Sequence, residues 1–497
     1  MLFNSMHFFV FFPIVLLIYY IIPKKTRYVW LLVCSYYFYM CWNAKYALLI
    51  GTSTIVTFFS GLFIEYFSQK ENDKVKIWGM RTTVFLSFFI NLGILIVFKY
   101  LDWILGNINA LFGQDISMPF SLVLPVGISF YTFQALSYTV DVYRKDITAE
   151  KNILKYALFV SFFPQLVAGP IERSKNLLEQ VRDLSVRQLW NGRKVLEGFI
   201  IMVWGYFMKL VIADRISILV DNVFDHYFMH NSVALFLGAL GFTIQIYCDF
   251  ASYSTIAVGA AKIMGFELME NFDTPYFSKS IKEFWRRWHI SLSGWFRDYL
   301  YIPLGGNRKG KFRTYANLMI TFLVSGLWHG ASWHYVIWGG IHGLYQIIGD
   351  ILSPIKKKIL IMGNVNTSAI SYRIGQTLLT FFMVMLAWIF FRAETLGDAV
   401  KYIIRLFSQF DPWSLFNGNI YTYGLNRFQM NILLFSLVLL FLISLIKKLK
   451  KLNLAEFLMT QGFVFRWGTV LFLILFIYVF GMYGEGFDAK QFIYFQF

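Results

Sequence analysis

Two histidines stand where an imidazole could exchange a proton with a second molecule. His329 lies in the stretch SGLWHGASWHYVIWGGIHG, where its neighbours are the small residues Gly326, Gly330, Ala331 and Ser332. Small neighbours leave the backbone around the ring open, and an imidazole with a pKa of about 6.5 takes up and returns protons at neutral pH. A dry surrounding would hold the ring neutral, which is the form that a general base requires. We therefore expect His329 to be a catalytic base.

The second histidine, His289, lies in the stretch IKEFWRRWHISLSGWFRDYL, which mixes charged residues with tryptophans. That density of charge excludes a lipid-exposed span, and the aromatic content excludes a free loop. We expect the segment to lie at the cytoplasmic interface or to enter the protein as a re-entrant pair of short helices. His289, together with Arg297 or Asp298, would then position a substrate or stabilise developing charge.

A basic turn, LYIPLGGNRKGKFR, follows and belongs on the cytoplasmic side of a membrane. Its basic residues are Arg308, Lys309, Lys311 and Arg313. They suit the phosphates of a nucleotide-like carrier, and they equally suit plain anchors on the inner face, because a glycine pair is a weak phosphate-binding signal. The region from 281 to 343 is thus the expected catalytic segment.

An acidic residue, Asp249, lies in the apolar run QIYCDFASYS, four residues after Gln245 and on the same face of a helix. A carboxylate there costs several kcal/mol unless it is paired or hydrated, so we expect a polar partner for it. Two roles remain open for Asp249, a hydrogen-bonded packing clamp and a direct part in the chemistry.

The remaining histidines and the cysteines give weaker signals. His334 and His342 are expected on the same helix as His329 but away from its face, as packing groups. His226 and His230 have the i, i+4 spacing that can share a metal, but no third ligand is near. Cys34, Cys41 and Cys248 form no CxxC pair, so neither a metal site nor a disulfide is expected.

The composition places these residues in a membrane protein. Hydrophobic residues make up 58% of the 497 residues and charged residues 15%, whereas a soluble domain has about a quarter charged. A span needs about 20 apolar residues, and such runs recur along the chain, so we expect one all-α polytopic domain over residues 1–497 with about 10 to 13 spans. The first run, residues 8–22, should stay as a span and not be cleaved.

The net charge of +17 lies in short clusters beside apolar runs. This is the positive-inside pattern, and the same positions would attract anionic lipid. It gives no indication of nucleic-acid binding. The clusters are Lys24 with Lys25 and Arg27, then 356–358, then 447–451.

Four connecting segments are expected to depart from plain spans. Residues 101–122 read as an outer loop with a partial interfacial helix, and residues 171–194 as an amphipathic surface helix. FFPQLVAGPIER should break a helix at membrane depth, which is tolerated only inside protein or along a cavity. Residues 125–143 are rich in small and hydroxyl groups, which fits either a tightly packed interior helix or a cavity lining.

Taken together, the motifs resemble the membrane-bound O-acyltransferases, and within them the membrane subunit of bacterial alginate and polysaccharide O-acetylation. The resemblance rests on EFWRRWHISLSGWFRDYLYIPLGGNRKG, GLWHGASWHYVIWGGIHG, QIYCDFASYS, FFPQLVAGPIER, the opening MLFNSMHFFVFF and the closing FIYFQF. It implies a helical bundle with re-entrant or interfacial helices around a central funnel. It also implies that His329 is the family's essential histidine and His289 its second.

The resemblance further implies transfer of an acetyl group from a cytoplasmic thioester to hydroxyls of an extracytoplasmic polysaccharide. It implies acetyl-CoA as the donor and no bound cofactor. An extracytoplasmic partner of the SGNH or GDSL type and a bacterial inner-membrane location are implied as well. The acceptor stays open between alginate, another exopolysaccharide, peptidoglycan and a secondary wall polymer. Alternatives are a D-alanyl transferase of the teichoic-acid type, an acyl-lipid transporter or flippase with His329 as a proton relay, and a scaffold for the partner.

Overall fold

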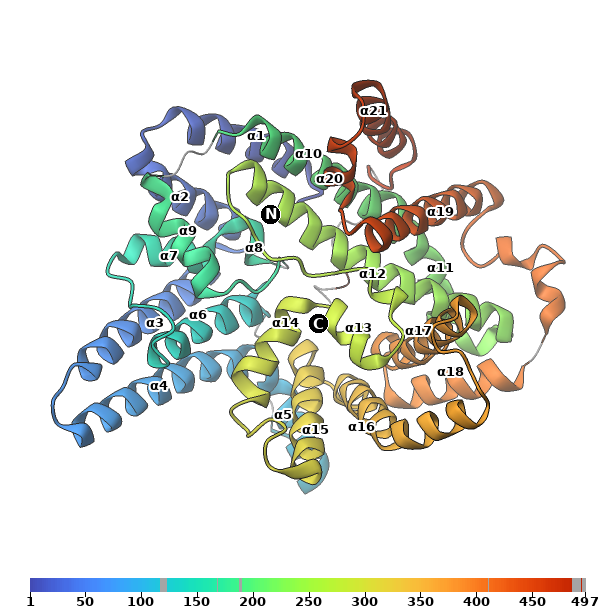
Figure 1. Cartoon of the computed structure of the whole chain (residues 1–497), viewed down its shortest axis with the longest axis horizontal. Helices are drawn as coiled ribbons and strands as arrows, with labels where there is room; N and C mark the ends of the chain where they lie inside the picture. The colour runs from blue at the N-terminus through green and yellow to red at the C-terminus, as the bar shows by residue number, and fades with distance from the viewer. Residues whose placement is uncertain (117–122, 168, 187–189, 410, 485–492, 494–497) are drawn as a thin grey trace. The chain divides into compact units, whose positions relative to one another are not determined.

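The computed structural model describes residues 1–116, 123–167, 169–186, 190–409, 411–484 and 493, and these residues form helices and no strand (Figure 1). The all-α polytopic class expected from the composition is confirmed. Contacts within the chain define two compact units. The first comprises Met1–Met202 with Tyr253–Met269, and the second comprises Val203–Ser252 with Glu270–Phe497.

The first unit is built from α1 to α10. Its bounds are α1 (Met6–Ile21), α2 (Arg27–Met40), α3 (Ala47–Ser68), α4 (Asp73–Leu95), α5 (Leu101–Phe112), α6 (Ile128–Tyr143), α7 (Ile153–Ser161), α8 (Phe163–Leu166), α9 (Glu179–Arg182) and α10 (Gly192–Tyr206). A π-helical turn at Ile96–Tyr100 joins α4 to α5, and α5 supplies the partial helix that was expected within residues 101–122. Residues 117–122 of that expected loop lie outside the described chain.

Polar contacts between helices hold this unit together. Ser53 on α3 donates to Asn91 on α4 at 2.6 Å, and Ser87 on α4 lies 3.2 Å from Thr139 on α6. Almost every side chain of α6 is buried, and Gln134 donates to the carbonyl oxygen of Phe159 at 2.7 Å. Of the two roles considered for residues 125–143, the tightly packed interior helix matches these contacts.

The chain breaks its helical run at FFPQLVAGPIER, as expected. α7 ends at Ser161, the four-residue α8 follows, and the next helical turn begins at Ser174. The surface helix expected over 171–194 is shorter in the structure, where one continuous helical run from Ser174 to Ser185 comprises a π-helical turn, α9 and a 3-10 turn. Residues 187–189 lie outside the described chain.

The second unit contains α11 to α21. A π-helical turn at Phe207–Ala213 continues α10 into α11, and α12 is shared between the two units. The bounds are α11 (Asp214–Asp225), α12 (Ser232–Ile263), α13 (Ile281–Arg287), α14 (Ile290–Phe296), α15 (Gly310–His329), α16 (Trp333–Met362), α17 (Ile370–Arg392), α18 (Leu396–Ser408), α19 (Arg427–Lys450), α20 (Leu454–Met459) and α21 (Phe463–Phe480).

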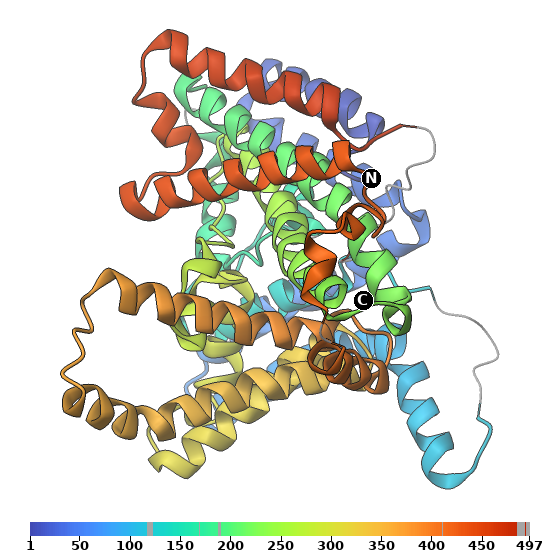
Figure 2. The same ribbon diagram turned by 90° about the vertical axis from the view of Figure 1, so that its right-hand side faces the viewer.

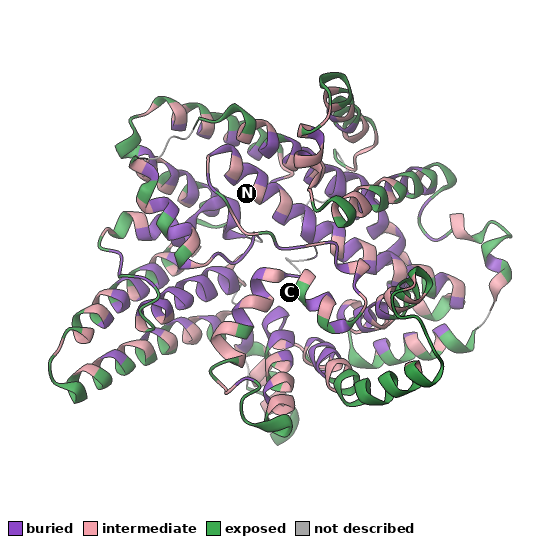
Figure 3. Ribbon diagram, in the orientation of Figure 1, coloured by how far each residue is buried: buried purple, intermediate pink, exposed green. Residues whose placement is uncertain are grey.

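Glycines allow α15 and α16 to lie in direct backbone contact. A Cβ atom on Gly326 would lie 2.2 Å from the carbonyl oxygen of Tyr335, and one on Gly339 would lie 2.2 Å from that of Phe322. Any larger side chain at either position would push the two helices apart. Many residues of α15 and α16 near this contact are buried, whereas residues 363–368, in the loop that joins α16 to α17, are exposed (Figures 2 and 3).

Seven helical runs of the described chain are long and apolar enough to cross a membrane, fewer than the 10 to 13 expected. They are Ala44–Ser68, Asp73–Phe112, Gly192–Asp225, Ser232–Ile263, Ile370–Arg392, Arg427–Lys450 and Phe463–Phe480. Other expected spans fall on shorter helices, among them α1 with 16 residues and α2 with 14. Large apolar side chains of α19 and α21 are exposed, as is typical of surfaces that face lipid.

Candidate active site

His329 is the last residue of α15, and its imidazole lies among aromatic rings. Gly330 adopts an extended backbone and ends the helix there. The ring centre of His329 lies 5.0 Å from that of Trp328, 5.1 Å from that of Trp338 on α16 and 5.3 Å from that of Phe391 on α17. The residue is only 6% exposed. His329 is therefore buried among aromatic side chains.

The break at Gly330 corrects the prediction that three histidines share one helix. His334 and His342 lie on α16, which begins at Trp333. His342 is fully buried, with its ring centre 5.1 Å from those of Trp285 and Trp338. Because Trp338 also contacts His329, the chain reversal brings His342 to the same aromatic cluster, which linear spacing along one helix could not predict.

His289 separates two short helices, α13 and α14, which confirms that the segment folds as a helix pair. Its backbone is left-handed, with φ 44° and ψ 55°, a conformation that costs about 1 kcal/mol or more in a residue with a side chain. The side chain is fully buried, and burial lowers the pKa of His289 to about 3. The imidazole is therefore neutral at pH 7.

The indole of Trp328 lies against both histidines. Its ring centre is 6.0 Å from that of His289 and 5.0 Å from that of His329. Phe250 on α12 covers His289 from another side at 4.7 Å. The structure thus brings the two histidines singled out in the sequence to one buried aromatic site, although they are 40 residues apart.

Asn271 holds His289 in place, and the sequence did not indicate it. Its carboxamide oxygen lies 3.1 Å from Nδ1 of His289 and accepts hydrogen bonds from the backbone N–H and the hydroxyl of Ser291, at 3.2 and 2.9 Å. The backbone N–H of Ile290 donates to the carbonyl oxygen of Asn271 at 2.9 Å. Asn271 lies 18 residues before His289, too far for helical or strand spacing to connect them.

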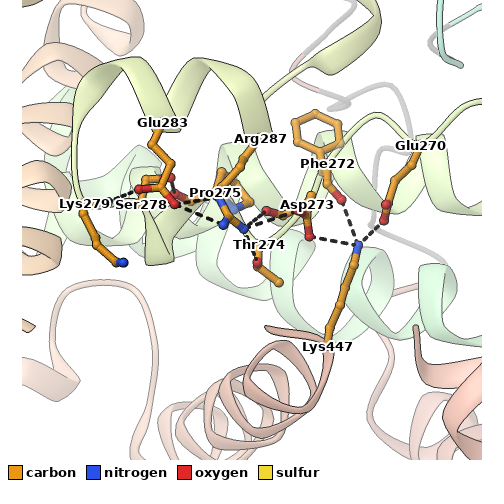
Figure 4. Close-up of polar contacts among 10 residues, drawn as sticks. All are labelled: Glu270, Phe272, Asp273, Thr274, Pro275, Ser278, Lys279, Glu283, Arg287 and Lys447. Atoms are coloured by element: carbon orange, nitrogen blue, oxygen red, sulfur yellow. Dashed lines mark hydrogen bonds and ion pairs between the residues drawn. The ribbon is translucent and has the colours of Figure 1, made fainter. Parts of the chain in front are cut away.

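An ion-pair network fixes the segment that carries Asn271 (Figure 4). Lys447 at the end of α19 pairs with Glu270 and donates to the carbonyl oxygen of Phe272 at 3.1 Å. Arg287 on α13 pairs with Asp273 at 3.3 Å and with Glu283 at 3.0 Å. Asn271 is therefore held between two anchored neighbours, Glu270 and Phe272.

The polar partner expected for Asp249 is Lys209 on the π-helical turn. The ammonium group of Lys209 lies 2.5 Å from Asp249 and 2.8 Å from Asp214, and all three side chains are buried. The second carboxylate oxygen of Asp249 accepts a hydrogen bond from the backbone N–H of Ile493 at 3.0 Å. Asp249 thus clamps three segments together, while its neighbour Phe250 contacts His289.

Arg297 and Asp298 form a salt bridge with each other at 2.7 Å on the π-helical turn after α14. The side chain of Arg297 is 67% exposed, whereas His289 is fully buried. The described contacts therefore place this pair on the surface, and the geometry does not bring Arg297 to the imidazoles.

The basic residues Arg308, Lys309, Lys311 and Arg313 are all exposed around the start of α15. The positive end of a helix dipole adds to their attraction for anions. His329 is at the other end of this 20-residue helix, which places it about 28 Å away along the axis. A donor held by its phosphates at this basic end would need a long arm to reach His329.

Comparisons with known proteins show the family of this chain. The family model of the membrane-bound O-acyltransferases matches residues 31–392. The chain is 39% identical to the probable alginate O-acetylase AlgI of Pseudomonas putida, over 84% of this chain and 82% of that protein. It is 34% identical to the peptidoglycan O-acetyltransferase of Helicobacter pylori, over 81% and 79%. It is 32% identical to the teichoic acid D-alanyltransferase of Streptococcus thermophilus, over 48% and 60%.

Proposed function

This chain belongs to the membrane-bound O-acyltransferase family, and from that premise we propose that it moves an acetyl group from cytoplasmic acetyl-CoA towards hydroxyls of an extracytoplasmic polysaccharide. That it is a multi-pass membrane O-acyltransferase follows from the family and from its apolar helices. The observation that carries the proposed site is the contact of Trp328 with two buried histidines.

In the proposed reaction, His329 takes the proton from the acceptor hydroxyl as its oxygen attacks the thioester carbonyl carbon. The new C–O ester bond forms, the C–S bond breaks, and the imidazolium returns the proton to the leaving thiolate, so that the site is regenerated. A base that moves a proton in the transition state contributes about 10²–10⁴-fold.

His289 is proposed to contact the reacting groups in the same site, where a ring nitrogen of the neutral imidazole can accept a hydrogen bond from the attacking hydroxyl. The exposed basic residues at the start of α15 would hold the phosphates of the donor. Because about 28 Å separates that helix end from His329, the acyl group must travel on an extended arm, which fits a thioester carrier better than a compact acyl phosphate. Asp249, Arg297 and Asp298 are proposed to support the fold of the site.

The proposed acceptor and location rest on the relatives. Two relatives that match over most of this chain are named for O-acetylation of alginate and of peptidoglycan, whereas the D-alanyltransferase matches over 48% of it. An acetyl group on a polysaccharide hydroxyl is therefore the favoured product. The bacterial inner membrane and an extracytoplasmic partner of the SGNH or GDSL type complete the proposal. Since a polymer cannot easily enter a buried site, the hydroxyl that attacks at His329 would belong to a smaller carrier, and the partner would complete the transfer of the acetyl group to the polymer.

The proposal is tested with the purified protein in detergent. Release of free thiol from acetyl-CoA should fall by about 10²-fold or more in His329→Gln, because the base is lost while the aromatic surroundings remain. His226→Gln is the matched control, since His226 is an exposed histidine of the same unit, and it should cleave like the wild type. Unchanged cleavage in His329→Gln would favour a transporter or a scaffold and reject this proposal.

A further inference from the structure

The carboxamide of Asn271 has a fixed orientation. Its Oδ1 atom faces the backbone N–H of Ser291 at 3.2 Å, and a backbone N–H can only donate. If the oxygen and nitrogen of the amide were exchanged, its NH₂ group would face the backbone N–H of Ser291. Two donors would then lie opposite each other in a buried place, which is energetically costly. The hydroxyl of Ser291 adds a second donor to the same oxygen at 2.9 Å.

This orientation determines which ring nitrogen of His289 carries the hydrogen. An amide oxygen accepts and does not donate, so Nδ1 of His289, 3.1 Å from it, must be the donor. The neutral ring then has its lone pair on Nε2. Free histidine favours the opposite arrangement, with the hydrogen on Nε2, so the protein selects the less common tautomer here.

Two further features show that the contact is built into the fold. The left-handed backbone of His289 directs its ring toward the segment that carries Asn271, and such strain persists only where the surroundings hold it. The chain on both sides of Asn271 is anchored by the ion pairs of Lys447 and Arg287 (Figure 4). Asn271 therefore cannot turn away without breaking several other contacts.

We infer that Asn271 is a positioning residue that holds neutral His289 as the Nδ1–H tautomer, so that Nε2 presents its lone pair to the reacting groups. The tautomer part stands on the geometry alone, and the use of Nε2 in acyl transfer rests on the proposed function. Asn271 acts through His289 and contacts no substrate. Its role is analogous to that of the acidic partner that orients the histidine of a hydrolase triad.

The tautomer is read directly by nitrogen NMR of the protein labelled with ¹⁵N-histidine and embedded in lipid bilayers. The His289 signals are identified by their loss in His289→Gln. The wild type should show hydrogen on Nδ1, and Asn271→Leu, which removes the acceptor at similar volume, should shift the population toward hydrogen on Nε2. Asn271→Asp keeps an acceptor oxygen and should retain the Nδ1–H form.

Asn317→Leu provides the matched control for this measurement. Asn317 is equally buried in the same unit, but it donates to the carbonyl oxygen of Gly306. Its loss should leave the His289 signals unchanged. If Asn271→Leu also leaves them unchanged, or if the wild type carries hydrogen on Nε2, the inference is overturned. Should Asn271→Leu fail to fold, Ser291→Ala, which removes one donor to the amide oxygen, gives a smaller shift in the same direction.

Kinetics separate this inference from the proposed function. Asn271→Leu should lower kcat for thioester cleavage by about 10²-fold with little change in KM, and Asn271→Asp should recover part of the rate. A tautomer shift in Asn271→Leu with wild-type kcat would refute the use of Nε2 in the reaction. Wild-type cleavage in both His289→Gln and His329→Gln would instead reject the proposed function, while the NMR result still decides the tautomer.

Discussion

His289 shows how single residues prepare this site before any substrate arrives. Its backbone is strained, its ring is fully buried, and its Nδ1 faces the Asn271 oxygen. The Trp-His contexts in the sequence singled out His289 and His329, and the structure places both rings beside Trp328. Asn271 could not be predicted, because its contact depends on the chain between Glu270 and Ile290 folding back on itself.

Glu172, in the stretch FFPQLVAGPIER, is a second buried residue with a measurable consequence. It accepts hydrogen bonds from the backbone N–H of Met269 at 2.5 Å and from the Asn176 amide at 2.6 Å, yet burial raises its pKa to about 7. The folded protein therefore binds this proton more tightly than the unfolded chain does. The resulting stabilisation is present below the ordinary carboxyl pKa and is lost as the pH rises through about 7.

Glu172→Gln should reveal this dependence, because glutamine stays uncharged. Between pH 5 and pH 8 the wild type should lose about 2.5 kcal/mol of stability relative to the variant. Thermal unfolding in detergent at the two pH values measures the difference, with exposed Glu71→Gln as the control. If the difference in stability between Glu172→Gln and the wild type is the same at both pH values, Glu172 is ionised equally in the folded and the unfolded protein.

At the scale of elements, the hairpin of α15 and α16 positions the site. The helix break at Gly330 was not predicted from the sequence, although Gly330 and Ser332 are residue types typical of a helix C-terminus and a helix N-cap. The break turns the chain back so that Trp338 meets His329. The sequence pattern therefore located the helical residues of this hairpin but assigned His334 and His342 to the wrong helix.

Gly326→Ala should disturb this hairpin, because the new Cβ would lie 2.2 Å from the backbone oxygen of Tyr335. Relief requires the helices to separate, at a cost of about 1–3 kcal/mol. The variant should unfold at lower temperature and lose thioester cleavage. Gly349→Ala is the control, since nothing lies within 4 Å of its new Cβ. Because alanine has a higher helix propensity than glycine, this variant should be at least as stable as the wild type. Equal unfolding temperatures for the two variants would argue against tight packing at Gly326.

At the scale of the whole molecule, the composition predicted the fold class, whereas the structure identified the partners of the buried charged residues. The apolar runs gave a polytopic helical protein, and an isolated Asp249 required a polar partner, but only the fold could identify Lys209, 40 residues earlier. The buried triad of Lys209, Asp214 and Asp249 ties α12 to the π-helical turn and to Ile493. The buried charges of these apolar helices thus lie beside opposite charges. Phe250, next to Asp249 in the chain, contacts His289.

The most direct test of the central claim, that His289 and His329 form one acyl-transfer site, is a double-mutant cycle on acetyl-CoA cleavage by the purified protein in bilayers. His289→Gln, His329→Gln and the double variant are compared with the wild type. When two residues act in the same step, replacing the second causes little further loss of rate once the first has been replaced. The double variant should therefore be about as slow as the slower single variant. Rate losses that multiply in the double variant, or wild-type rates in either single variant, would contradict a shared site.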